Sequence, residues 1–251
     1  MPVVPGVPLD EDAELAALRS LLSSGPRTNR QRPAALSPQQ PSSAGAAQSV
    51  SPSGAGSTQR LLQLLQDRSG LEEAQPMLEN EMKTREQQLG PTHPDTLLSV
   101  TCLAMLFQAK GLFKEALPLY ERALKGFEQK YGPTHRDTLI SVNNLAVLLK
   151  AMGKLAEARP LYERVLAGDE AQLGPTHPHT LDSIYNLARL YQAEGHMEQA
   201  LTLFRRELDG CARQYGNEHQ ETRTSAGNLC GILSELGQKD EATAIAKHFG
   251  L

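Results

Sequence analysis

The sequence contains no tryptophan, and aromatic residues make up only 4% of it. No apolar run reaches the roughly 18–20 residues that a membrane-spanning helix needs. A core with few large aromatic side chains has to be built from smaller ones. The hydrophobic residues, 39% of the chain, are mostly leucine and alanine, which enter helices at little cost. The composition therefore favours an all-helical fold and gives no reason to expect a membrane protein.

Charge and cysteine content exclude further classes. The formal net charge of −4 provides no electrostatic basis for binding nucleic acid. The three cysteines, Cys102, Cys211 and Cys230, are odd in number and never spaced as CxxC, so we expect no disulfide framework. They are expected to be small buried residues in a reducing compartment, the cytoplasm. The acidic, proline-broken start lacks the basic and apolar regions of a signal peptide.

Catalytic motifs are missing as well. The sequence contains no GxxxxGK[ST], no HExxH and no GxSxG, and no GxGxxG follows a predicted strand. We therefore expect no enzyme activity and no cofactor.

The N-terminal region differs from the rest of the chain. Residues 1–22 form a short segment in which 10–22 carries leucines at helical spacing behind an acidic start, which predicts an amphipathic helix. Residues 23–57 consist largely of Ser, Ala, Pro, Gly and Gln, a composition that cannot bury enough apolar surface to fold, so this linker is predicted to be disordered. The repeat array is expected over 58–251.

One motif recurs at a constant spacing along this array. Its copies are GPTHPDTL at 90–97, GPTHRDTL at 132–139, GPTHPHTL at 174–181 and a divergent GNEHQETR at 216–223. Each copy is followed by a Leu-Ala or Leu-Cys pair, then by a glycine and then by an alanine. The glycines are Gly111, Gly153, Gly195 and Gly237, and the alanines are Ala116, Ala158, Ala200 and Ala242. Glycine suits the end of a helix and alanine a close helix crossing. Each unit is predicted to be a helix, a glycine turn, a second helix and a loop. The array should hold about five such pairs, with degenerate outer ones.

The loop histidines, His93, His135, His177 and His219, raise the question of a metal site. Zinc–nitrogen bonds are about 2.0–2.1 Å long, whereas packed helices lie about 8–10 Å apart, and each repeat supplies one histidine. We therefore expect no metal and a structural role, in which a side chain of each Thr-His-x-Asp-Thr cluster caps the start of the next helix; the sequence does not assign which one.

The pattern of Leu-Ala, glycine, alanine and aromatic residues resembles the tetratricopeptide repeat. The period is longer than the roughly 34 residues common in that repeat. This longer period and the histidine loop are similar to the kinesin light chain and nephrocystin type. The resemblance covers residues 59–251. It implies a right-handed α-solenoid of antiparallel helix pairs that binds a protein or peptide partner in a concave groove lined by the first helices.

The resemblance also implies which residues face that groove. The residue before each Leu-Ala or Leu-Cys pair should point into it; these residues are Asn144, Asn186 and Asn228, with Cys102 breaking the series. On the same face are Asn143, Val147, Lys150, Asp182, Tyr185 and Arg189. Amide side chains can hold a peptide backbone, and Lys150 and Arg189 could meet acidic groups. The alternative is that the asparagines bond within or between repeats.

These observations predict a non-catalytic adaptor in the cytoplasm. One alternative is a structural protein that self-associates through the ends of the helix stack, which light scattering at several concentrations would reveal. Another is a light chain-like subunit of a microtubule motor, associated with the cytoskeleton. Because no heptad run is long enough for a coiled coil, binding to a kinesin heavy chain is not expected. A further hypothesis is that the 10–22 helix competes for the groove.

Overall fold

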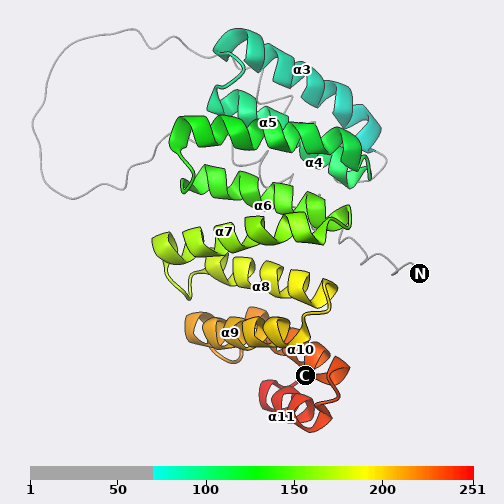
Figure 1. Cartoon of the computed structure of the whole chain (residues 1–251), viewed down its shortest axis with the longest axis vertical. Helices are drawn as coiled ribbons and strands as arrows, with labels where there is room; N and C mark the ends of the chain where they lie inside the picture. The colour runs from blue at the N-terminus through cyan, green and yellow to red at the C-terminus, as the bar shows by residue number, and fades with distance from the viewer. Residues whose placement is uncertain (1–69) are drawn as a thin grey trace, which may run out of the picture. The chain divides into compact units, whose positions relative to one another are not determined.

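The computed structural model describes residues 70–251 (Figure 1). The predicted helix over 10–22, the predicted linker over 23–57 and the first residues of the predicted repeat array, 58–69, lie outside these residues. Within the described part of the chain every regular element is an α-helix. The bounds are α3 Leu71–Leu89, α4 Pro94–Ala109, α5 Phe113–Tyr131, α6 Arg136–Ala151, α7 Leu155–Leu173, α8 Pro178–Ala193, α9 Met197–Tyr215, α10 Gln220–Glu235 and α11 Lys239–Phe249.

Corresponding helices begin at the same constant spacing as the motif, which confirms the predicted alternation of first helices (α4, α6, α8 and α10) with second helices (α3, α5, α7, α9 and α11). The prolines inside the second helices, Pro76, Pro118 and Pro160, do not end them. Each lies near the start of its helix, where a missing N–H bends a helix more than it breaks it.

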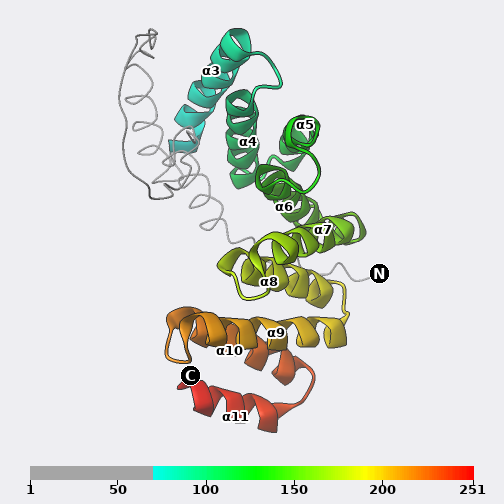
Figure 2. The same cartoon turned by 90° about the vertical axis from the view of Figure 1, so that its left-hand side faces the viewer.

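The described residues divide into two compact units, 70–119 and 120–251, with the division inside α5. In the first unit α3 packs against α4, and the Lys110 ammonium bonds to Glu72 at 3.0 Å and to Gln75 at 2.7 Å. In the second unit each helix from α6 to α11 packs against the next one along the chain, and Figures 1 and 2 show these neighbours running in alternating directions. Packing between sequence neighbours is the defining property of a helical solenoid, so the predicted fold class is confirmed.

Alanines mark the helix crossings. Ala158 and Ala200 in the second helices are fully buried, and so are Ala146 and Ala188 in the first helices. Because a methyl group takes little room, the paired helices approach closely, and larger side chains fill the space beside the crossing. Phe204, for example, lies in a cluster with Leu229 and Ile232. Cys102 and Cys211 are buried in helices, as predicted, whereas Cys230, also predicted to be buried, is half-buried in α10.

The turn inside each pair depends on glycine. Gly153 has φ +75°, a left-handed conformation that strains other residues. Its N–H bonds to the Lys150 carbonyl at 3.0 Å, and the next N–H, that of Lys154, bonds to the Leu149 carbonyl at 2.9 Å. These two bonds satisfy carbonyls at the end of α6 that would otherwise lack partners. The predicted glycine turn is therefore present.

Candidate partner-binding surface

The first helices owe their position to the repeated loop, which begins with a glycine in an unusual conformation. Gly174 has φ +88° and ψ +168°, a combination open to glycine and almost closed to other residues. The hydroxyl of the fully buried Thr180, in the first turn of α8, donates a hydrogen bond of 2.8 Å to the Gly174 carbonyl. This bond fixes where the second helix of one repeat stops relative to the first helix of the next.

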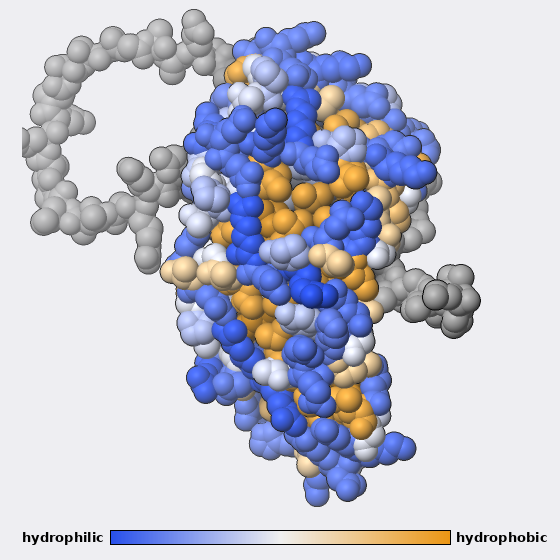
Figure 3. All heavy atoms as spheres, viewed as in Figure 1, coloured by the Kyte–Doolittle hydropathy of each residue, from blue (hydrophilic) through white to orange (hydrophobic). Residues whose placement is uncertain are grey.

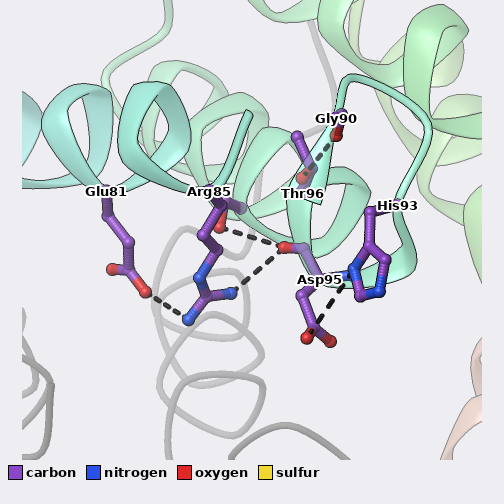
Figure 4. Close-up of polar contacts among 7 residues, drawn as sticks. Glu81, Arg85, Gly90, His93, Asp95 and Thr96 are labelled. Atoms are coloured by element: carbon purple, nitrogen blue, oxygen red, sulfur yellow. Dashed lines mark hydrogen bonds and ion pairs between the residues drawn. The ribbon is translucent and has the colours of Figure 1, made fainter. Parts of the chain in front are cut away.

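The same bond occurs in all four copies of the loop. The threonine-to-glycine distances are 2.9 Å for Thr96 and Gly90, 2.8 Å for Thr138 and Gly132, 2.8 Å for Thr180 and Gly174 and 2.7 Å for Thr222 and Gly216. Figure 4 shows the first copy. There, Arg85 of α3 also donates to the Asp95 carbonyl at 3.1 Å and pairs with Glu81. Each loop is thus closed by contacts among its own residues and the flanking helix turns.

The four loop histidines are helix caps. In every copy the histidine Nδ1 accepts the backbone N–H of the residue two positions later, at 3.2 Å; the acceptors are His93, His135, His177 and His219. An Nδ1 that accepts carries no proton, so each ring is held in the tautomer with its hydrogen on Nε2. The predicted structural role is confirmed. Among residues 70–251, no three His, Cys, Asp or Glu side chains gather in a way that could hold a metal ion.

The predicted groove residues all lie in the second unit, on three successive first helices. Their positions are α6 for Asn143, Asn144, Val147 and Lys150, α8 for Asp182, Tyr185, Asn186 and Arg189, and α10 for Asn228. All are half-buried except Asp182, which is exposed. A first helix that packs on both neighbours still leaves this row of side chains in contact with solvent.

The structure brings some of these residues together directly. The Asn186 amide reaches the Asn143 oxygen at 3.5 Å, a weak bond between neighbouring first helices. The Asn144 side-chain nitrogen is buried and finds no hydrogen-bond partner within the described part of the chain. The Tyr185 ring lies edge-on to Phe204 with centroids 6.2 Å apart, so it packs partly into the core. One asparagine thus bridges repeats, as the alternative interpretation expects, while Asn144 keeps an unused donor.

No carboxylate among residues 120–251 pairs with either of two cations on this face, Lys150 and Arg189. Burial lowers the pKa of Lys150 to about 8, and the nearby Arg189 charge contributes to the shift. Arg189 donates to the Gln192 oxygen at 2.9 Å, and Gln192 in turn donates to the Glu235 carboxylate at 2.9 and 3.0 Å. A neutral amide therefore stands between Arg189 and the acid. The Gln192–Glu235 link was not predicted, because side chains so far apart in the chain show no pairing pattern in the sequence.

On the opposite face, which the second helices form, charged side chains of successive second helices pair with one another. Arg164 of α7 pairs with Glu128 of α5 at 2.6 Å, Arg206 of α9 pairs with Glu170 of α7, and Arg205 of α9 pairs with Glu241 of α11 at 2.8 Å. Figure 3 looks onto these second helices and shows polar side chains over α7 and α9, with apolar ones in the seams between them. Charge on this face joins repeat to repeat, whereas Lys150 and Arg189 form no ion pair with a carboxylate of the second unit.

The described helices include none that is both long enough and apolar enough to cross a membrane. Among curated proteins, none matches this sequence. Solved structures do match. The chain is similar to the TPR-like repeats of a Podosopora anserina protein described as a kinesin light chain, with 28% identity, a TM-score of 0.70 and coverage of 78% of this chain and 92% of that one.

Two further structures share the fold at lower identity. BtubC (BKLC) from P. vanneervenii is 18% identical with a TM-score of 0.66, over 96% of this chain and 87% of its own. MamA from Desulfovibrio magneticus RS-1 is 16% identical with a TM-score of 0.51, over 78% of this chain and 90% of its own. Both show the fold alone.

The family assignment rests on the sequence as well as on the structure. The tetratricopeptide repeat model matches four overlapping stretches, residues 57–129, 97–171, 137–211 and 180–248. Together these stretches span most of the chain, and they coincide with helix pairs that have the long period of the kinesin light chain type. The chain belongs to the tetratricopeptide repeat family and has repeats of the kinesin light chain type.

Proposed function

We propose that this chain is a non-catalytic adaptor that binds an acidic segment of a partner protein along the first helices α6, α8 and α10. Tetratricopeptide repeats in general bind protein partners. The observation that carries the finer proposal is the pair of cations, Lys150 and Arg189, that no carboxylate among residues 120–251 neutralises. A half-buried ammonium gains more from an incoming carboxylate than an exposed one does, because less water screens the pair.

The amides beside these cations support the same proposal. Asn144, Asn186 and Asn228 are half-buried side chains at equivalent positions of three successive repeats. An extended peptide presents a carbonyl or an N–H at regular intervals, which a row of amides can hold without selecting side chains. The cations would then select acidic residues and the amides would hold the backbone.

Two further features support an adaptor without chemistry of its own. The loop histidines use their acceptor nitrogens to cap helices, so those nitrogens are not available as general bases. Burial raises the pKa of Cys102 to about 12 and that of Cys211 to about 11, which keeps both thiols protonated and unreactive. Buried free thiols suit the reducing cytoplasm, where we place the protein.

The experiment compares partner capture by the intact chain with capture by a Lys150→Gln, Arg189→Gln variant and by a Lys125→Gln variant. Lys125 is exposed on α5 and serves as the charge control. Circular dichroism first establishes equal helicity. Removing both cations should weaken capture by about tenfold or more, since charge-assisted hydrogen bonds contribute about 1.5–3 kcal/mol each. The Lys125→Gln variant should retain every partner.

A second arm replaces Asn144, Asn186 and Asn228 with alanine. Partners lost from both groove variants would place binding on this face. Identical partner lists for all four proteins would refute the proposal and locate the interaction elsewhere. Light scattering of the same samples detects the competing behaviour, because self-association through the stack ends requires an apparent mass that rises with concentration.

A further inference from the structure

Glu207 breaks the repeat pattern at a buried position. The equivalent residues of the two preceding second helices are Ala123 and Val165, and in α3 the residue is Glu81, which is half-buried and paired with Arg85. Glu207 of α9 has only 7% of its surface exposed. A carboxylate that leaves water without a cationic partner is strongly destabilised.

No cation among residues 120–251 forms an ion pair with this carboxyl. The adjacent arginines of α9 are engaged elsewhere, Arg205 with Glu241 and Arg206 with Glu170. The groups that do face Glu207 are acidic or neutral, and they come from both helices packed against α9. They are Asp182 of α8, Glu221 and Ser225 of α10 and Cys211 of α9 itself.

The serine beside this carboxyl also departs from its pattern. Ser99, Ser141 and Ser183, its equivalents in earlier repeats, each donate to the carbonyl four residues before them, at 3.1, 3.0 and 3.0 Å. Among the described residues, the buried Ser225 hydroxyl and one oxygen of Glu207 make no hydrogen bond of normal length and angle, although the two groups lie close enough to interact. At this junction a protonated carboxyl can donate a hydrogen bond to the hydroxyl, whereas an ionised carboxylate can accept one from it.

The electrostatic balance at this junction favours the protonated carboxyl. Burial raises the pKa of Glu207 from the usual 4.5 to about 7; a hydrogen bond from the Ser225 hydroxyl opposes this rise, and the charges of Asp182 and Glu221 contribute to it. Between those two values the folded state binds more protons than the unfolded state. The stability contribution is therefore complete below pH 4.5 and is lost as the pH rises through about 7.

We propose that the junction of α8, α9 and α10 is a pH-sensitive device, in which the protonated form of Glu207 holds the last two first helices together and its ionisation loosens them. Those helices carry Asn186 and Asn228. The device acts on the stability of the last repeats, so it holds whether or not the proposed groove binds a partner.

The test follows the thermal midpoint of the full chain by circular dichroism between pH 6 and 8. Over this range the thermal midpoint of the wild type should fall about 4 °C further than that of a Glu207→Gln variant. The reason is that the folded wild type releases one proton with a midpoint near 7, and the thermal midpoint of a domain of this size shifts about 2–4 °C per kcal/mol of stability. Glu198→Gln, at an exposed position of the same helix, should keep the wild-type slope.

A direct titration keeps the proposal falsifiable if Glu207→Gln does not fold. The ¹³C chemical shift of the Glu207 carboxyl in the native chain, assigned through a Glu207→Val variant that copies residue 165, should titrate with a midpoint near 7. A midpoint near 4.5, or equal pH slopes for the wild type and Glu207→Gln, would overturn the proposal.

Discussion

Two glycines inside helices provide a sharp test of the packing described above, because their surroundings are opposite. Gly168 lies in α7, where an added Cβ would stand 2.5 Å from the Leu139 Cδ1 of α6. Leu139 is only 3% exposed, so its side chain has little room to move away. Gly227 lies in α10, where an added Cβ would meet nothing within 4 Å. Neither glycine has a positive φ.

The same substitution should therefore have opposite effects. Alanine in place of glycine inside a helix gains about 0.5–1 kcal/mol, mainly because the unfolded chain has less freedom to lose. At Gly227 nothing opposes this gain, so Gly227→Ala should stabilise the protein by that amount. At Gly168 the gain is offset by overpacking, which costs about 1–3 kcal/mol, so Gly168→Ala should destabilise it by about 1 kcal/mol.

Urea denaturation followed by circular dichroism gives the two free energies of unfolding. A double variant separates packing from propensity, because Leu139→Ala empties the space that the new methyl group would occupy. In that background Gly168→Ala should become stabilising. If Gly168→Ala and Gly227→Ala raise the free energy of unfolding equally in the otherwise native chain, α6 and α7 do not pack as closely at Gly168 as described here.

Two further substitutions probe the repeated loop by the same assay. His177→Ala removes the acceptor for the His179 N–H and should lower the free energy of unfolding by about 1 kcal/mol. His177→Asn introduces a good capping residue and should restore most of that stability. Equal losses of stability for the two variants would exclude a capping role. Thr180→Val keeps the shape but leaves the Gly174 carbonyl without its 2.8 Å bond, so it should cost about 1–2 kcal/mol, and a Thr180→Ser variant as unstable as valine would contradict that account.

The sequence predicts the helices well because their determinants are local. The glycine at 153 and the alanine at 158 specify a turn and a crossing through properties of single residues, and the constant period of the motif repeats that information. Pro178 begins α8, where the missing N–H of a proline costs nothing, and this preference is local too. No knowledge of distant contacts was needed for any of these features.

The missed features depend on three-dimensional neighbours. Histidine is not a usual capping residue, so the role of Nδ1 at His177 emerges only from the loop geometry. The Asn143–Asn186 bond joins helices whose relative rotation cannot be read from spacing. Glu207 looks like part of a solvated helix face, and only the packing of α8 and α10 buries it. The partner-facing role of Lys150 and Arg189 stays a prediction.

The loop also bears on how such a chain can change in length. The bond from Thr180 to Gly174 and the cap from His177 to His179 lie within one short stretch of consecutive residues, so the start of α8 is encoded without reference to any other repeat. A recombination event that duplicates or removes one repeat unit between equivalent codons would leave every remaining loop complete. The gene can therefore vary the number of repeats in single steps, and selection can act on array length separately from the residues that line it.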